Sequence, residues 1–212
     1  QRAQWVLMGG DGLNLIFLLG ASGNTVFWQP VIQCLPQDYS TMVVAYPSFG
    51  GYPDDVDVQS FEGLQAYVLN QIQQPSVVIA QSMGGIFAVQ AALKKPEQVQ
   101  ALVLVATSGG IDLSSFQVAD WREDYQQSFT VPGWFVQHQS DLTDSLERIQ
   151  CPVLLIWGDA DPISPVAVGQ FLHRQIPHAE LHIVSRGQHD LAYVHAEHVA
   201  QLIQNFLVKL RV

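Results

Sequence analysis

Residues 76–94 read SVVIAQSMGGIFAVQAALK, and this stretch decides the fold class of the chain. Its first part, 76–80, is apolar at almost every position and rich in β-branched residues, which predicts a strand that is covered on both faces. The small residues around Ser82 predict a tight turn. The apolar spacing over 84–94 then predicts a helix.

The same alternation of short apolar runs and helical spacing extends over the rest of the chain. Five further runs predict strands, at 13–19, 41–46, 101–106, 152–157 and 180–184. Three further stretches predict helices, at 61–73, 166–175 and 195–209. The run at 5–8 predicts an additional antiparallel edge strand. The expected fold is α/β, an open, doubly wound and mostly parallel sheet whose ligands bind beyond the carboxyl ends of the strands.

One segment, 111–150, departs from this alternation. It separates two predicted strands and mixes aromatic residues with many polar ones. A loop of this length without structure of its own is unusual in a compact domain. We therefore expect a small helical lid insertion at 111–150 within a single domain that spans 1–212.

The composition favours a compact enzyme and excludes nucleic acid as a partner. Hydrophobic residues make up 48% of the 212 residues and charged residues 13%, far from the composition of disordered chains. The formal net charge of −10 would repel a phosphate backbone. The expected partner is a small-molecule substrate that is neutral or weakly polar, and the sequence leaves the oligomeric state open.

Membrane insertion and disulfide bonding are also not expected. No stretch reaches the roughly 18 to 20 apolar residues of a membrane span, and the first residues lack the apolar run of a signal peptide. These features predict a cytoplasmic protein. Cys34 and Cys151 are too few for a disulfide framework, and both are predicted to be buried thiols.

Ser82 is the candidate nucleophile, because a sharp turn between strand and helix would expose its hydroxyl. The helix N-terminus would also leave backbone N–H groups free to stabilise an oxyanion. The alternative is that Ser82 only caps the helix, since serine is a preferred N-cap residue. Residues 80–84, AQSMG, resemble the G-x-S-x-G motif of the α/β-hydrolase family, with Ala80 in place of the first glycine. This resemblance implies that Ser82 is the nucleophile, and it covers nearly the whole chain from residue 13.

A serine hydroxyl needs a base to accept its proton, and the base needs a carboxylate to orient it. The turn GDADPISP at 158–165 is similar to the family's G-x-x-D-x-x-x-P turn, which implies Asp161 as the acid. Asp159 is the neighbouring alternative for the acid. The other interpretation of Asp159 is a solvent-exposed turn residue. The loop SRGQHDL at 185–191 resembles the family's glycine-histidine loop, with a glutamine inserted, which implies His189 as the base.

Alignment with the family places the oxyanion-hole N–H groups on Ala21 and Met83. The family usually has histidine and glycine where this chain has Leu19 and Gly20, a change that affects the support of the turn rather than its backbone donors. The candidates for a substrate pocket are Ser22, Phe27, Trp28, Trp121 and Trp134. For Ser22 the alternative is a hydroxyl that stabilises the turn, and for the aromatic residues it is packing onto the sheet.

These residues together predict a serine hydrolase that cleaves a small ester-like substrate through an acyl-enzyme. The same triad could instead hydrolyse a carbon–carbon bond, a thioester or a lactone, and the same fold could serve as a noncatalytic small-molecule receptor. No cofactor is expected. His195 and His198 lie three residues apart on a predicted helix, but no third ligand accompanies them, so no metal is expected.

Overall fold

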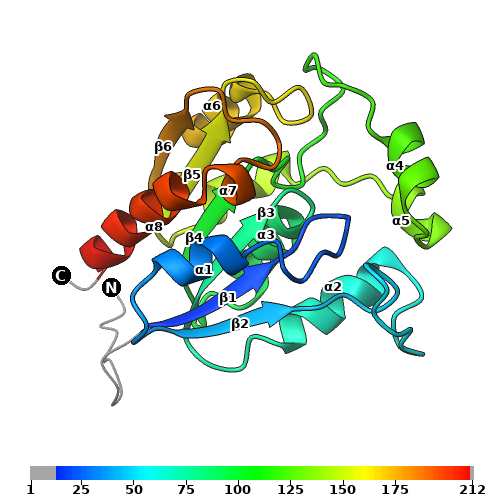
Figure 1. Cartoon of the computed structure of the whole chain (residues 1–212), viewed down its shortest axis with the longest axis horizontal. Helices are drawn as coiled ribbons and strands as arrows, with labels where there is room; N and C mark the ends of the chain where they lie inside the picture. The colour runs from blue at the N-terminus through cyan, green and yellow to red at the C-terminus, as the bar shows by residue number, and fades with distance from the viewer. Residues whose placement is uncertain (1–12, 211–212) are drawn as a thin grey trace.

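Six parallel strands form one open sheet in the computed structural model, which describes residues 13–210 (Figure 1). The strands are β1 (Asn14–Leu18), β2 (Ser40–Val44), β3 (Ser76–Gln81), β4 (Val99–Val105), β5 (Val153–Gly158) and β6 (Ala179–Val184). Their order across the sheet is β2-β1-β3-β4-β5-β6, and each neighbouring pair is parallel. The predicted α/β class and all six predicted strands are confirmed, whereas the predicted edge strand at 5–8 lies outside the described residues.

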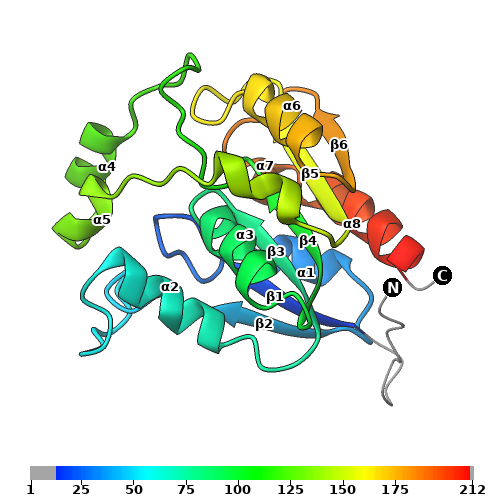
Figure 2. The ribbon, with the colours of Figure 1, turned by 180° about the vertical axis from the view of Figure 1, so that it is seen from behind.

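Helices cover both faces of the sheet. They are α1 (Gln29–Cys34), α2 (Phe61–Asn70), α3 (Gly84–Lys94), α6 (Val166–Gln175), α7 (Leu191–Val194) and α8 (Ala196–Leu210). Helices α1 and α8 lie on one face, and α2, α3 and α6 lie on the other (Figures 1 and 2). The four predicted helices are confirmed as α2, α3, α6 and α8, while α1 and α7 are too short to show a helical period. Within residues 13–210, every helix is too short or too polar to span a membrane.

The burial of each strand follows from its place in the sheet. Strands β3 and β5 are buried along their whole length, because helices cover them on both sides. The edge strands β2 and β6 are partly exposed, and their sequences are correspondingly more polar. The continuous apolar runs in the sequence therefore mark the interior strands of the sheet.

The segment 111–150 contains three short helices, of which the last packs against α3 and α6. They are α4 (Arg122–Ser128), α5 (Gly133–Gln137) and the 3-10 helix η1 (Thr143–Arg148). Helices α4 and α5 lie on the side toward which β1 and β2 run (Figure 1). Aromatic contacts join this segment to the body: Phe135 packs edge-on against Phe49, and the His138 ring stacks on Phe61 with 3.6 Å between the ring centroids.

The two cysteines differ in exposure. Cys34 is exposed at the end of α1, so the prediction of a buried thiol is wrong for this residue. The physical reason is that α1 is short and buries only Val31, so its last residue is left at the surface. Cys151 is half-buried, and burial raises the pKa of its thiol to about 12.

We expect a thiol reagent such as a disulfide dye to modify Cys34 in the native protein and to leave Cys151 unmodified. The thiolate is the reactive form, and a pKa of about 12 leaves only about one Cys151 side chain in 10⁴ ionised at pH 8. Absorbance should therefore report one fast thiol in the native protein and two after denaturation. The variant Cys34→Ser should lose the fast reaction, and two equally fast native thiols would contradict this expectation.

Candidate active site

Ser82 lies at a sharp turn between β3 and α3. Its backbone φ is 52°, in the left-handed region where residues other than glycine are uncommon. The turn is held from two sides: the Ser82 N–H donates to the Val105 carbonyl at 3.0 Å, and the Thr107 hydroxyl donates to the Ser82 carbonyl at 2.5 Å. A serine held in a strained backbone conformation between a strand and a helix is typical of a nucleophile elbow.

Close packing explains the small residues that flank this turn. A Cβ atom on Gly84 would lie only 2.7 Å from the Leu19 carbonyl oxygen. Ala80, on the other side of the turn, is fully buried. The absence of a side chain at position 84 lets the first turn of α3 touch the end of β1, which brings the turn after β1 next to Ser82.

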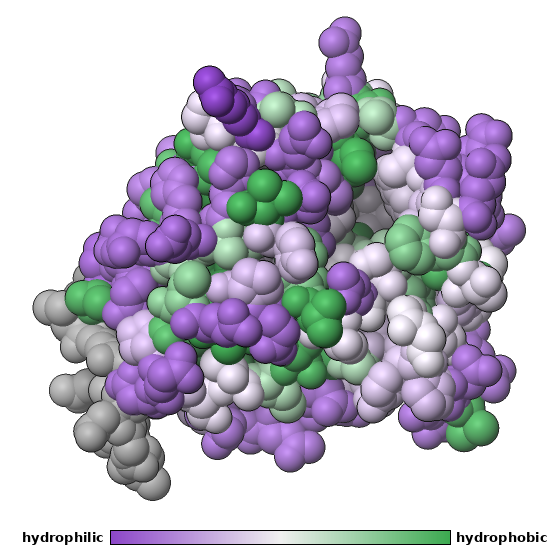
Figure 3. Space-filling view, viewed as in Figure 1, coloured by the Kyte–Doolittle hydropathy of each residue, from purple (hydrophilic) through white to green (hydrophobic). Residues whose placement is uncertain are grey.

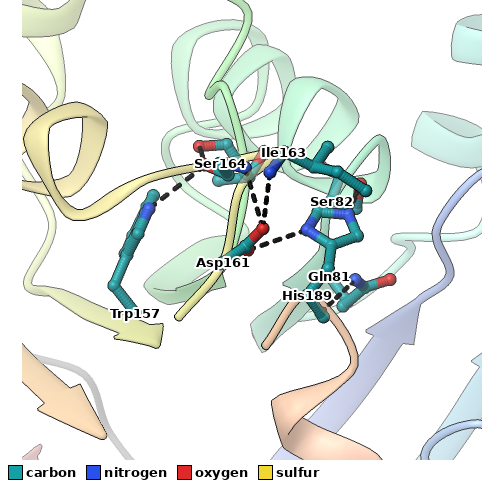
Figure 4. A network of polar contacts seen from close by, with 8 residues as sticks. Gln81, Ser82, Trp157, Asp161, Ile163, Ser164 and His189 are labelled. Carbon is teal, nitrogen blue, oxygen red and sulfur yellow. Dashed lines mark hydrogen bonds and ion pairs between the residues drawn. The ribbon is translucent and has the colours of Figure 1, made fainter. Parts of the chain in front are cut away.

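Two hydrogen bonds connect Ser82, His189 and Asp161 in series (Figure 4). The Ser82 hydroxyl lies 2.8 Å from Nε2 of His189, and Nδ1 of His189 lies 2.9 Å from Oδ2 of Asp161. Asp161 follows β5, and His189 follows β6. Because a carboxylate can only accept, the proton of the neutral imidazole lies on Nδ1 and Nε2 is the acceptor for the serine hydroxyl. The Asp161 side chain is fully buried, whereas that of His189 is 24% exposed and so can be reached from the surface.

The carboxylate of Asp161 is fixed by its own loop. Its Oδ1 accepts the backbone N–H groups of Ile163 at 2.8 Å and Ser164 at 3.0 Å (Figure 4). These bonds leave Oδ2 as the atom that faces His189. Both oxygens of this buried carboxylate therefore have hydrogen-bond partners.

The neighbouring Asp159 has a different place. It is exposed, and its Oδ1 accepts the backbone N–H of Arg186 at 2.7 Å. Arg186 has a φ of 61° and begins the loop that leads to His189. Asp159 therefore braces the loop of the histidine, and the structure brings only Asp161 to the histidine ring.

The loops that carry Asp161 and His189 touch through two glycines. A Cβ atom on Gly158 would lie 2.1 Å from the carbonyl oxygen of Gly187, which is a backbone atom and cannot rotate away. The Ala160 N–H also donates to the Gly187 carbonyl at 2.9 Å. The approach of the two loops, and with it the distance from acid to base, depends on glycine at position 158.

We expect Gly158→Ala to destabilise the protein by about 2 kcal/mol, because the added methyl group forces the two loops apart. For a chain of this size, that corresponds to a fall in Tm of about 4 to 8 °C in a thermal melt. The matched control is Gly133→Ala, whose Cβ would meet no atom within 4 Å and whose Tm should stay within about 2 °C of the wild type. An equal Tm for both variants would contradict the close approach.

A buried polar network supports the acid and the nucleophile together. The Trp157 indole N–H donates to the Ser164 hydroxyl, and that hydroxyl donates to the Thr107 carbonyl, each at 3.1 Å. Ser164 also binds Asp161 through its backbone N–H, and Thr107 binds the Ser82 carbonyl through its side chain. No sequence signal pointed to Ser164 or Thr107, because their roles depend on strands β4 and β5 lying side by side.

Gln81 links the nucleophile elbow to the loop of the base. Its side-chain amide donates to the His189 carbonyl at 3.2 Å (Figure 4), and its Oε1 fills the space beside Gly20 that a Cβ there would need. Gln81 is buried, with 6% of its surface exposed. The residue before the nucleophile thus contacts both the turn after β1 and the histidine loop, which the motif alone does not indicate.

The two predicted oxyanion donors are Ala21, in the turn after β1, and Met83, the residue after Ser82. Ala21 lies three residues after the end of β1 and Met83 lies directly before α3, and the close approach of Gly84 to Leu19 keeps these two segments together. Neither backbone N–H donates a hydrogen bond to another residue within 13–210. Both N–H groups are therefore free to donate, as the donors of an oxyanion hole must be.

The predicted pocket residues differ in burial and in their partners. Trp28 is fully buried and donates its indole N–H to the Leu18 carbonyl at 3.0 Å, so it belongs to the core and not to a pocket wall. Ser22 accepts the Asn24 N–H at 3.3 Å, the bond of a turn-stabilising hydroxyl. Phe27 is half-buried and stacks on Tyr193.

The two tryptophans of the 111–150 segment are half-buried. Trp121 packs against Tyr125, and the Arg122 guanidinium lies 5.0 Å from its ring centroid. Trp134 lines a cavity of about 630 Å³ between the loop at 48–59 and the stretch at 130–134. None of the triad residues lines this cavity, so it is separate from the hydrogen-bonded serine.

The surface is hollowed between the part that carries α4 and α5 and the body of the molecule, on the face shown in Figure 3. The strands run toward this side, as Figure 1 shows.

Across residues 13–210, no three histidine, cysteine or acidic side chains lie close enough to form a metal site. His195 is half-buried, and His198 lies exposed on α8.

Two known families each match part of this chain. A family described as serine aminopeptidase, S33, matches residues 43–132, and a family described as TAP-like protein matches residues 120–212. The fold is also that of solved esterases: a thermophilic esterase from Thermogutta terrifontis superposes with a TM-score of 0.79 at 20% identity, covering 96% of this chain and 92% of that one. MenH from S. aureus superposes with a TM-score of 0.77 at 15% identity, covering 94% and 95% of the two chains.

Curated relatives match the chain over most of its length. A pimeloyl-[acyl-carrier protein] methyl ester esterase from Aliivibrio salmonicida is 23% identical over 93% of each chain. A poly(3-hydroxyalkanoate) depolymerase from Ectopseudomonas oleovorans is 29% identical over 89% of this chain and 81% of its own. The chain therefore has the α/β-hydrolase fold, and the proteins it is similar to are esterase-like hydrolases.

Proposed function

We propose that this protein hydrolyses carboxylic esters through an acyl-enzyme on Ser82, with His189 as the general base and Asp161 as the residue that orients it. The observation that carries the proposal is the unbroken series of hydrogen bonds from the Ser82 hydroxyl through the imidazole to a buried carboxylate. A hydroxyl in this setting can lose its proton to Nε2 as it attacks a carbonyl carbon.

In the first half of the reaction, Ser82 attacks the ester and its proton passes to His189. The negative charge on the former carbonyl oxygen is stabilised by the N–H groups of Ala21 and Met83. Collapse of this tetrahedral intermediate breaks the bond to the alcohol, which takes the proton from His189. In the second half, His189 removes a proton from water, and the water attacks the acyl-enzyme to release the acid and restore Ser82.

We also propose that the segment 111–150 is a lid over this site. The Ala119 N–H donates to the carbonyl of Pro162 at 2.8 Å, directly after the acid Asp161. Tyr125 reaches the turn on the opposite side of the nucleophile, where its hydroxyl donates to the Ala21 carbonyl. The segment therefore contacts the acid loop and the oxyanion turn, between which the substrate must enter.

A fluorophosphonate probe and an ester panel test the proposed activity. We expect the probe to modify Ser82, as seen by peptide mass spectrometry, and the protein to cleave p-nitrophenyl esters and aliphatic methyl esters. Methyl esters belong in the panel because several relatives are named for one. Thioesters and lactones test the other reactions open to the same triad. A sample that cleaves no ester and is not labelled at Ser82 would contradict the proposal. If such a sample still binds a small molecule, the result would favour a noncatalytic receptor.

A further inference from the structure

The turn between β1 and α1 has four consecutive carbonyl groups that all accept hydrogen bonds. From Leu18 to Ala21, the donors are the Trp28 indole at 3.0 Å, the Tyr46 hydroxyl at 2.7 Å, the Gly23 N–H at 3.1 Å and the Tyr125 hydroxyl. A planar peptide whose carbonyl is held has its N–H held too, pointing the opposite way. The four bonds therefore determine the direction of the N–H groups that line this turn.

Ala21 depends on two of these bonds. Its N–H belongs to the same peptide plane as the Gly20 carbonyl, which the Gly23 N–H holds. The next peptide plane, which carries the Ala21 carbonyl, is held by Tyr125. With both flanking peptide planes fixed, the Ala21 N–H is aimed before any substrate arrives, and such preorganisation is the basis of oxyanion stabilisation.

The donor to Ala21 differs from the others in its origin. Trp28, Tyr46 and Gly23 lie in the turn itself or in the core beside it, whereas Tyr125 comes from α4 in the 111–150 segment. Within residues 13–210, this is the only side-chain hydrogen bond between the segment and the rest of the chain. The oxyanion turn is therefore completed by a residue of the lid.

Tyr125 is well placed to remain a donor. Its ring packs against Trp121, Phe129 and Phe135, with centroids 5.2 to 5.7 Å away, and only 8% of the residue is exposed. Burial raises the pKa of its phenol, so the hydroxyl keeps its proton at every pH at which the protein is assayed. The ring supplies the packing, and the hydroxyl supplies the bond to Ala21.

We propose that Tyr125 is a positioning residue for the oxyanion hole: docking of the 111–150 lid aims the Ala21 N–H at the developing oxyanion through the Tyr125 hydroxyl. The inference rests on the proposed function, because it assigns Ala21 to the oxyanion hole of that reaction. It predicts that the lid affects the transition state as well as access to the site. Tyr125 itself touches neither the substrate nor the reacting atoms.

The test is Tyr125→Phe, which keeps the ring and removes only the hydroxyl. We expect kcat for a short-chain p-nitrophenyl ester to fall about 5- to 10-fold, as for a weakened hydrogen bond in the transition state, while KM changes less than about twofold. An alkyl boronic acid, which forms a tetrahedral adduct with the serine, should bind more weakly by a similar factor. The matched control is Tyr52→Phe, which removes an exposed phenol and should leave all three values unchanged.

The outcomes separate this inference from the proposed function. An unchanged kcat and boronate affinity in Tyr125→Phe, with Ser82 labelled and ester cleaved as in the wild type, overturns the role of Tyr125 alone. A raised KM with kcat unchanged also overturns it, since the hydroxyl would then serve substrate binding. If the wild type is neither labelled nor active, the proposed function is overturned, and the role of Tyr125 with it. A thermal melt of Tyr125→Phe with a cooperative transition like that of the wild type establishes that the fold is retained.

Discussion

Replacing Ser82 with alanine is expected to lower kcat for ester hydrolysis by about 10⁵- to 10⁶-fold, because loss of the nucleophile alone removes nearly all the rate that a triad provides. Binding of substrate should be retained, since the change removes only the hydroxyl and leaves the rest of the site in place. Labelling by the fluorophosphonate probe should disappear at the same time. The measurement is steady-state hydrolysis of a p-nitrophenyl ester at a protein concentration high enough to detect the residual rate.

The control for Ser82→Ala is Ser115→Ala, which changes an exposed serine of the 111–150 segment and should leave kcat unaltered. A second variant, Ser82→Gly, tests the backbone of the elbow. Glycine adopts the observed φ of 52° without strain, so Ser82→Gly should be more stable to unfolding than Ser82→Ala by about 1 kcal/mol. Activity retained in either Ser82 variant would contradict the role of this hydroxyl.

Replacing Asp161 with asparagine is expected to lower kcat by about 10⁴-fold while the fold is retained. The reason lies in the two backbone N–H groups that bind Oδ1. They hold the amide oxygen of an asparagine in the same place, so its NH₂ group must face Nδ1 of His189. The imidazole then carries its proton on Nε2, toward Ser82, and can no longer accept one from the serine.

The matched control for Asp161→Asn is Asp159→Asn, two residues earlier on the same turn. Asp159 binds the Arg186 N–H and not the histidine ring, and an amide oxygen can accept the same bond. Its kcat should stay within about threefold of the wild type, a change of about 0.6 kcal/mol in the barrier. Similar losses in the two variants would show that the turn as a whole, and not the carboxylate of Asp161, supports the activity.

Most of the fold follows from local patterns. Continuous apolar runs predict the interior strands because helices cover both faces, and β3 and β5 are accordingly buried throughout. The short helices α1 and α7 escape prediction because neither is long enough to show a period. The prediction that Cys34 is buried was wrong for a related reason, because the burial of the end of such a short helix depends on what packs against it.

The candidate site divides in the same way. The motifs around Ser82, Asp161 and His189 are short and each follows a strand, and parallel strands deliver their carboxyl ends to one edge of the sheet. The resemblance of these motifs to those of the family therefore predicts which side chains meet there. The pocket residues have no such pattern: the structure buries Trp28 in the core, and Trp134 lines a cavity that no triad residue lines.

By itself, the sequence determined the class of fold. It also determined which residues can form a serine–histidine–aspartate series, and the order in which the loops that carry them occur along the chain. Those properties depend on local periodicity and turn chemistry, which are written in neighbouring residues. Only the tertiary structure decided that Asp161 and not Asp159 faces the imidazole, and that Tyr125 reaches the Ala21 carbonyl. Such contacts join segments that lie far apart in the chain, and they exist only once the sheet and the 111–150 segment have packed together.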